Sequence, residues 1–382
     1  MYNLETIIEE TLARTLSQSA YAYREKGDIT MSKKLYSDAL KIEKRLAVNN
    51  QARFQPLVAK TLHTIGELYE EVNKYDLAIK YYKKSISTTK KMFKLNKKEY
   101  AQLFASRYVE VANLCKRDYR YAEAEHFYNK ALEVYKIVDM QNTPLRQVKM
   151  LNIYHALAII CQEMGKVQET KEAYMGLLNI YKNLVNDESD KYKPELAMVL
   201  FDLGTLYFEH KRQNKAGEVY LFALELFSYL HSRDSHTYKE ILAKTLHNLA
   251  QIYTAQNDFP AALSGYREAL NHYIELADDN PSRYGAEVAV VFKHLASFYK
   301  KQNRMDLAEY FYLRQVELYT ELNSYHEYEY DLRLAAAIVE GVEYYGQHTL
   351  SLYQAELIVA RYEEEFLLKK IHSLRVEWAV NR

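Results

Sequence analysis

Apolar side chains recur along this chain at helical spacing. Between residues 56 and 98 they form two runs, Leu57, Val58, Leu62, Ile65, Leu68 and Tyr69, followed by Leu77, Ala78, Ile79, Tyr82 and Ile86. Such spacing places apolar residues on one face of a helix. Pro56 fits the first turn of a helix, Asn73 suits the left-handed conformation that ends one, and Asp76 can cap the next. The segment therefore predicts two antiparallel helices joined by a tight turn.

The same pattern returns every 46 residues. Tyrosines stand at Tyr36, Tyr82, Tyr128, Tyr174, Tyr220, Tyr266 and Tyr312, and small residues at Ala20, Gly66, Ala112, Ala158, Gly204, Ala250 and Ala296. The turn position holds Gly27, Asn73, Gly165, Asn257 and Asn303. One helix pair cannot bury its apolar face alone, so neighbouring copies must stack. We therefore expect an all-α solenoid.

The period divides the chain into about eight repeats that form one array. The expected ranges are 4–50, 51–97, 98–143, 144–189, 190–235, 236–281, 282–327 and 328–370, with a C-terminal cap at 371–382.

The motif spacing resembles that of the tetratricopeptide repeat family. The family pattern is Trp-x2-Leu-Gly-x2-Tyr, then Ala-x3-Phe, then Ala, and this chain has Leu62, Ile65, Gly66, Tyr69, Ala78, Tyr82 and Ser85 at those positions. The family period is about 34 residues, so the longer period here lengthens each helix by about a turn and a half. The resemblance implies a right-handed α-solenoid, a superhelix of stacked antiparallel helix pairs whose first helices line a concave groove.

Composition narrows the class of partner. The chain has 51 basic and 51 acidic residues, and this balance argues against nucleic acid or an anionic membrane as a partner. No window approaches the roughly 18–20 apolar residues that span a bilayer. The N-terminus also lacks the basic start and apolar core of a secretion signal. We expect a cytoplasmic protein without nucleic-acid or membrane partners.

Charge is uneven along the chain. Residues 1–98 carry 19 basic and 11 acidic groups, whereas residues 305–368 carry 3 basic and 13 acidic groups. A solvated surface is one interpretation of this difference. The functional interpretations are an acidic partner at the basic end, or weak head-to-tail self-association between the two ends.

Residues typical of catalytic or metal sites do not come together. The sequence lacks a Gly-rich phosphate loop, HExxH, a Cys-x2-Cys pair and Gly-x-Ser-x-Gly. His63, His155 and His247 share one repeat position in alternate repeats, roughly 20 Å apart, too far to bind one metal ion. Cys115 and Cys161 also share a position and stand roughly 10 Å apart, beyond disulfide reach. We expect neither an enzyme nor a cofactor or metal site.

The resemblance also implies which residues face a partner. Counted from the small residue of each repeat, the inward positions form a polar, amide-rich strip that can hydrogen-bond an extended peptide. Its members are Lys60, His63, Glu67, Glu110, Asn113, Asn152, His155, Phe201, Asp202, Thr205, Lys244, His247, Asn248, Gln251 and His294. A merely hydrated groove is the alternative interpretation.

Two hypotheses for the function follow. The first is a non-catalytic scaffold that binds a protein or peptide in its groove. The second is a regulatory or sensor subunit whose superhelix changes shape and so controls a partner enzyme. The family's paired Lys and Asn residues that clamp a C-terminal carboxylate are absent, because those positions hold Ser17, Tyr21, Thr64, Ser106 and Glu110.

Overall fold

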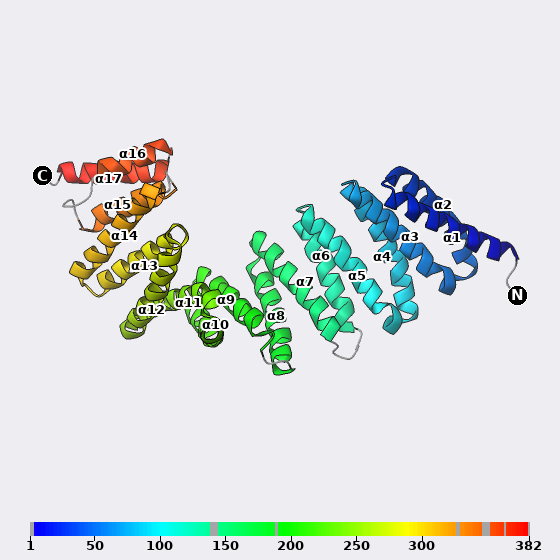
Figure 1. Ribbon diagram of the computed structural model, residues 1–382, viewed down its shortest axis with the longest axis horizontal. Helices are drawn as coiled ribbons and strands as arrows, with labels where there is room; N and C mark the ends of the chain where they lie inside the picture. The colour runs from blue at the N-terminus through cyan, green and yellow to red at the C-terminus, as the bar shows by residue number, and fades with distance from the viewer. Residues whose placement is uncertain are drawn as a thin grey trace. The chain divides into compact units, whose positions relative to one another are not determined.

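The computed structural model describes residues 4–137, 144–187, 190–325, 329–345, 352–362 and 364–380. These residues form an all-α solenoid of antiparallel helix pairs, and no strand occurs among them (Figure 1). The chain divides into two compact units, Met1–Asn183 and Leu184–Arg382, and the boundary between the units falls inside helix α8.

In the first unit, neighbouring helices in the chain pack side by side (Figure 1). Its helices are α1 (Leu4–Glu25), α2 (Ile29–Asn49), α3 (Gln51–Glu71), α4 (Tyr75–Leu95), α5 (Lys97–Arg117), α6 (Tyr121–Ile137), α7 (Pro144–Glu163) and most of α8 (Val167–Asp187). One core cluster joins α1, α2 and α3 through Ala20, Tyr36, Leu62 and Leu68. Helices such as α2 and α4 are amphipathic and bury their apolar faces between their neighbours.

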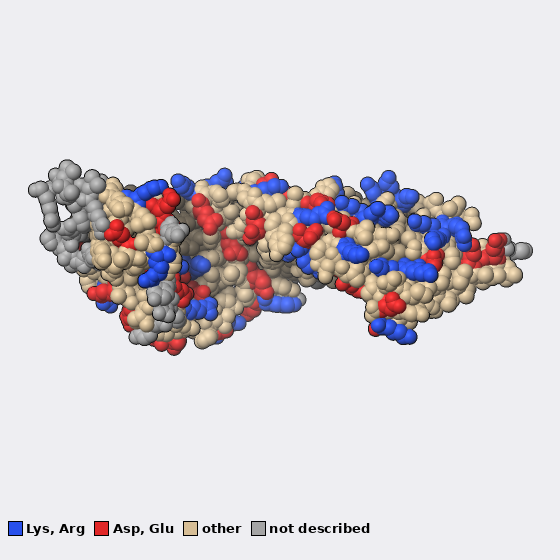
Figure 2. All heavy atoms as spheres, turned by 90° about the horizontal axis from the view of Figure 1, so that it is seen from above, with Lys and Arg blue, Asp and Glu red and all other residues tan. Residues whose placement is uncertain are grey.

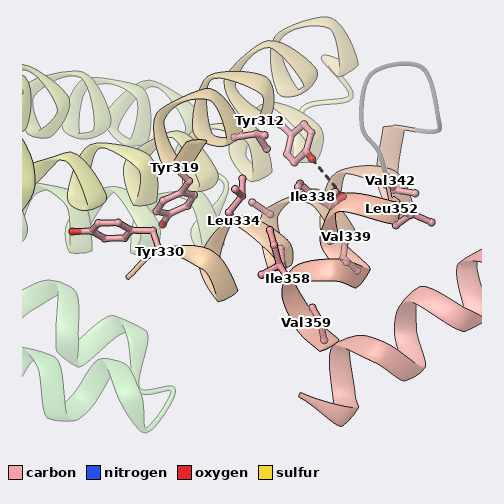
Figure 3. Close-up of a cluster of buried hydrophobic side chains, with 14 of the residues drawn as sticks. Tyr312, Tyr319, Tyr330, Leu334, Ile338, Val339, Val342, Leu352, Ile358 and Val359 are labelled. Carbon is pink, nitrogen blue, oxygen red and sulfur yellow. Dashed lines mark hydrogen bonds between the residues drawn. The ribbon is translucent and has the colours of Figure 1, made fainter. Parts of the chain in front are cut away.

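The second unit continues the same arrangement. Its helices are α9 (Lys193–Glu209), α10 (Gln213–Arg233), α11 (Ser235–Gln256), α12 (Phe259–Asp279), α13 (Pro281–Lys301), α14 (Met305–Tyr325), α15 (Asp331–Tyr345), α16 (Leu352–Arg361) and α17 (Glu365–Val380). In the last core cluster Tyr312, Ile338, Val342 and Ile358 pack together, and the Tyr312 hydroxyl donates to the Ile338 carbonyl at 3.5 Å (Figure 3). Helix α17 packs against α15 and α16 and begins before the predicted cap at 371–382.

In the seven helix pairs from α1 and α2 to α13 and α14, the turn contains one residue with a left-handed backbone. These residues are Gly27, Asn73, Tyr119, Gly165, Lys211, Asn257 and Asn303, with φ from 56° to 80°. The sequence predicts five of them. Tyr119 and Lys211 adopt the same conformation because the turn closes with the same bond, from Arg120 N to Cys115 O and from Arg212 N to Tyr207 O, at 2.8 Å in each case.

Two details of the second predicted repeat are wrong. Pro56 lies inside α3, which begins at Gln51 because the Asn50 side chain accepts a bond from the backbone N–H of Arg53 and caps the helix there. Asp76 lies in the first turn of α4, and Lys74 occupies the cap position without a side-chain bond. An acidic residue in a first turn still favours the helix through its dipole.

The recurring tyrosines fill the space that the small residues leave. Tyr82, Tyr128, Tyr220 and Tyr266 are each at most 4% exposed. A Cβ added at Gly66 would lie 2.6 Å from the Tyr82 ring, and one at Gly204 would lie 2.7 Å from the Tyr220 ring. The two helices of a pair therefore approach closely at the small residue, with the ring packed flat against it.

Candidate partner-binding site

The first helices of neighbouring pairs bond to one another through side chains. We call the surface formed by α1, α3, α5 and α7 in the first unit, and by α9, α11, α13 and α15 in the second, the first-helix face of each unit. Several of these contacts join residues 47 positions apart, as in Arg24–Glu71, Glu70–Arg117, His247–His294 and Lys293–Glu340. Others join residues 43 positions apart, as in Arg24–Glu67 and Arg283–Glu240. The 47-residue separation is one more than the repeat period, because the side chain of one helix reaches the next position on its neighbour.

Four of the predicted residues meet in the first unit. His63, Glu67, Glu110 and Asn113 line an acidic pocket of ≈ 730 Å³ together with Arg24, Glu70, Glu71 and Arg117. The His63 ring is buried, with Nε2 3.3 Å from Glu67 Oε1 and Nδ1 3.4 Å from Glu110 Oε2. The pocket therefore holds one imidazole between carboxylates from two helices.

Arginines balance the carboxylates of the acidic pocket. Arg24 bonds to Glu67 and Glu71, and Arg117 donates to Glu70 at 2.5 Å. The hydrogen bond from His63, aided by Arg24, lowers the pKa of Glu67. Because charges in this pocket are paired and half-exposed, its surface can exchange one polar partner for another at modest energetic cost.

Three other predicted residues of the first unit lie apart from this pocket. Lys60 is exposed on α3, and Asn152 is exposed on α7. His155 is half-buried, with Nε2 3.0 Å from the Tyr181 hydroxyl of α8. His155 therefore helps to hold a helix pair together.

In the second unit, five predicted residues surround Tyr220. The hydroxyl of Tyr220 is 2.9 Å from Thr205 Oγ1 and accepts a bond from Asn248 Nδ2 at 3.0 Å. Phe201 is 6% exposed and packs on the same ring at 5.6 Å between centroids, so it belongs to the core and offers little surface to a partner.

Asp202 and Lys244 complete this group. The ammonium of Lys244 lies 5.9 Å from the Phe201 ring centroid. Burial raises the pKa of Asp202 to about 6, and the positive charge of Lys244 opposes that shift. Asp202 thus changes charge close to neutral pH.

His247 and His294 form a hydrogen bond that the sequence analysis did not anticipate. Nε2 of His247 lies 2.7 Å from Nδ1 of His294. Burial lowers the pKa of His247 to about 3 and that of His294 to about 4, so both rings are neutral at pH 7. Gln251 lies one turn further along α11 and is half-buried.

A second pocket of the first unit was not predicted from the sequence. This N-terminal pocket, of ≈ 650 Å³, is enclosed by α1, α2 and α3. Its lining includes Arg14, Ser17, Tyr21, Tyr36, Glu43, Leu46, Leu57, Lys60, Thr61 and Thr64. The signal in the sequence was Glu43, an acidic residue within the apolar spacing of its helix.

The described residues contain neither a membrane-spanning helix nor a cluster of metal ligands. No helix in the described ranges is long and apolar enough to cross a membrane. Among the same residues, no three His, Cys, Asp or Glu side chains come together as metal ligands would. Cys115 and Cys161 are both buried, and each is a thiol.

Models of one protein family match two parts of the chain. Residues 11–91 and residues 242–281 each match a tetratricopeptide repeat model. No curated protein matches the chain.

Several solved structures are similar to the chain. BtubC (BKLC) from P. vanneervenii is 20% identical, with 65% of this chain and 92% of that chain covered at a TM-score of 0.44. The C-terminal part of a TPR repeat-containing protein from Cytophaga hutchinsonii is 15% identical, with coverage of 79% and 94% at 0.43. The nuclear import adaptor Nro1 of S. pombe is 15% identical, with coverage of 71% and 95% at 0.41.

The matched segments agree with the motif found throughout the repeats. Residues 11–91 include Gly66, Tyr69 and Tyr82, and residues 242–281 include Ala250, Tyr253 and Tyr266. Antiparallel helix pairs built on this motif recur in both units. Residues 11–91 and 242–281 of the chain are tetratricopeptide repeats.

Proposed function

We propose that this chain is a non-catalytic scaffold that binds a protein or peptide along its first-helix face. The observation that carries the proposal is the concentration of half-exposed polar side chains and of two pockets on the first helices. Carboxylate, amide and guanidinium groups there can hydrogen-bond a polypeptide backbone or its side chains. The equal numbers of basic and acidic residues favour protein over nucleic acid as the partner. A cytoplasmic location belongs to the same proposal.

Site-specific photo-crosslinking tests which face is used. A photoreactive phenylalanine derivative is placed at the exposed first-helix positions Asn113, Asn152 and Lys244, one variant at a time, and expressed in the native host. Matched controls carry it at Lys90 on α4 and Phe222 on α10, which are exposed on second helices. We expect the first-helix variants to crosslink a common protein and the controls not to crosslink it. Equal crosslinking from both faces would contradict the proposal.

A further inference from the structure

The N-terminal pocket contains a buried acceptor that lacks a donor. Glu43 is 4% exposed, and its Oε1 accepts a hydrogen bond from Thr61 Oγ1 at 2.9 Å. Its Oε2 is buried, and within the described ranges no group donates to it. A buried carboxylate oxygen without a donor is unfavourable. The pocket volume of ≈ 650 Å³ lies within the roughly 300–1,000 Å³ of ligand sites.

Comparison between repeats shows that Glu43 replaces an aromatic ring. At intervals of 46 residues after Glu43 the chain has Thr89, Tyr135, Tyr181, Phe227, Tyr273 and Tyr319, each at most 6% exposed. Five of these six residues are aromatic and fill the space between their helix pair and the next. In the first repeat a smaller, charged side chain occupies that position and leaves room beside it.

The residue that faces this position also has a smaller side chain in the first repeat than in the fourth and fifth repeats. In the fourth repeat the Tyr181 ring packs edge-on against His155 at 6.0 Å, and in the fifth Phe227 packs against Phe201 at 6.5 Å. The position of His155 and Phe201 is occupied by Ser17 in the first repeat. Both Ser17 and Glu43 line the N-terminal pocket. The ring pair of the fourth and fifth repeats is thus replaced in the first repeat by a serine, a glutamate and a hollow.

The lining defines what would fill the hollow. Tyr36, Leu46 and Leu57 supply apolar walls that suit a ring, and Glu43 Oε2 requires an N–H or O–H donor. Among the other charged groups of the lining, Arg24 is paired with Glu67 and Glu71, and Glu10 is paired with Arg53. Arg14 and Lys60 are therefore the lining cations that can attract negative charge beside a neutral donor. Figure 2 shows Lys and Arg side chains gathered over the first unit, at the right of the view, and residues 1–98 carry 19 basic against 11 acidic groups.

We propose that the N-terminal pocket binds the side chain of a tyrosine or tryptophan in an acidic segment of the partner. The ring takes the place of the missing aromatic pair, its O–H or N–H donates to Glu43 Oε2, and flanking carboxylates lie near Arg14 and Lys60. This inference rests on the proposed function and names the chemistry of the partner.

Labelled synthetic peptides test it against the full chain. The probes are Glu-Glu-Tyr-Glu-Glu and Glu-Glu-Trp-Glu-Glu, blocked at both ends, with Glu-Glu-Phe-Glu-Glu and Lys-Lys-Tyr-Lys-Lys as matched comparisons, and fluorescence polarisation reports binding. We expect the phenylalanine peptide to bind about tenfold more weakly than the tyrosine peptide, because it lacks the donor. The lysine-flanked peptide should bind more weakly still. No binding by either the tyrosine or the tryptophan peptide would overturn the proposal.

Two substitutions of Glu43 test whether the preference for the tyrosine peptide depends on the N-terminal pocket. Glu43→Leu keeps the hollow but removes the acceptor, so the preference for tyrosine over phenylalanine should disappear. Glu43→Tyr restores the residue type of the other repeats, so it should fill the hollow, raise the melting temperature and abolish binding. Circular dichroism establishes that each variant is folded. A folded Glu43→Leu variant that keeps the tyrosine preference, or a folded Glu43→Tyr variant that binds as the wild type does, would refute the proposal.

Charge variants separate the pocket from the general basicity of the unit. The double substitution Arg14→Gln, Lys60→Gln should lower the affinity for the acidic tyrosine peptide about tenfold. The double substitution Lys90→Gln, Lys91→Gln makes an equal charge change on the exposed surface of α4 and should lower that affinity less than twofold. Equal losses in the two double variants would contradict a specific site. If the N-terminal pocket does not bind the peptides, crosslinking from Asn113, Asn152 and Lys244 is still expected. Failure of the pocket proposal is therefore distinguishable from failure of the scaffold function.

Discussion

At the scale of single residues, the buried side chains of Glu43 and His247 respond to pH in opposite directions. Burial raises the pKa of Glu43 from 4.5 to about 7, whereas burial lowers the pKa of His247 from 6.5 to about 3. Glu43 therefore favours the folded state when protonated, at low pH. His247 favours the folded state when neutral, at higher pH. The effects of the two side chains on stability therefore oppose each other between pH 4.5 and pH 6.5.

The substitution Glu43→Gln should show this dependence directly. The carboxyl of Glu43 contributes stability below its ordinary pKa of 4.5, and that contribution is lost as pH rises to about 7. The neutral amide does not titrate, so the variant should gain about 2–3 kcal/mol of unfolding free energy relative to wild type between pH 4.5 and pH 8. Urea unfolding at both pH values measures the difference. Glu25→Gln, at an exposed position of α1, is the control, and an equal pH dependence in both variants would contradict the assignment.

The residues that the sequence predicts best are those fixed by the repeat itself. Tyr82, Tyr220 and Tyr266 were identified from their 46-residue interval, and all are buried against the small residue of their pair. Glu43 could have been found in the same way, because aligning the repeats places it among buried aromatics. Whether its second oxygen has a donor could not be predicted, since that depends on the rotamers of several neighbouring side chains.

At the scale of helices, turns were more predictable than helix starts. The turn residues Asn73, Asn257 and Asn303 have φ of 56°, 64° and 59°, as their chemistry suggests. Pro56 was misleading because a proline that suits a first turn is also tolerated one turn further on, where it removes one backbone bond. The contact between His247 and His294 escaped prediction because histidines were compared at 46 residues, whereas neighbouring first helices bond at 47.

Substituting alanine for each of two glycines in the second unit should change the unfolding free energy in opposite directions. Gly204→Ala would place a Cβ 2.7 Å from the Tyr220 ring, so we expect a loss of about 1–3 kcal/mol in unfolding free energy. At Gly217 of α10, an added Cβ has its nearest neighbour at 3.6 Å, so Gly217→Ala should gain up to about 1 kcal/mol from helix propensity. Chemical denaturation of both variants measures the two effects. A stabilised Gly204→Ala variant would show that the ring is not held against that helix.

At the scale of the whole molecule, charge is distributed unevenly along the chain. Residues 1–98 have a net charge of +8, and residues 305–368 have a net charge of −10. The fold class followed from the period, and both units consist of the expected helix pairs. The division into two compact units within α8 could not be predicted from the period, because the 46-residue interval continues across that helix without a change.

The uneven charge predicts self-association that depends on salt. Because opposite charges at the two ends attract at low ionic strength, sedimentation equilibrium in about 10 mM salt should show weak oligomers. These should dissociate above about 0.3 M, where the screening length is about 6 Å. Replacing Lys90, Lys91 and Lys94 with Glu should prevent this association, because they belong to the basic end. A monomer at every salt concentration would rule out the head-to-tail interaction.

The pairing of residues 47 positions apart determines how freely the repeats can be rearranged. Arg24 of the first repeat bonds to Glu71 of the second, and Lys293 of the seventh bonds to Glu340 of the eighth, so in these repeats the two partners of an ion pair lie in successive copies. Exchanging two repeats would keep every helix and every tyrosine but place mismatched charges side by side. The order of these repeats therefore determines which charges meet, and the repeats are not interchangeable.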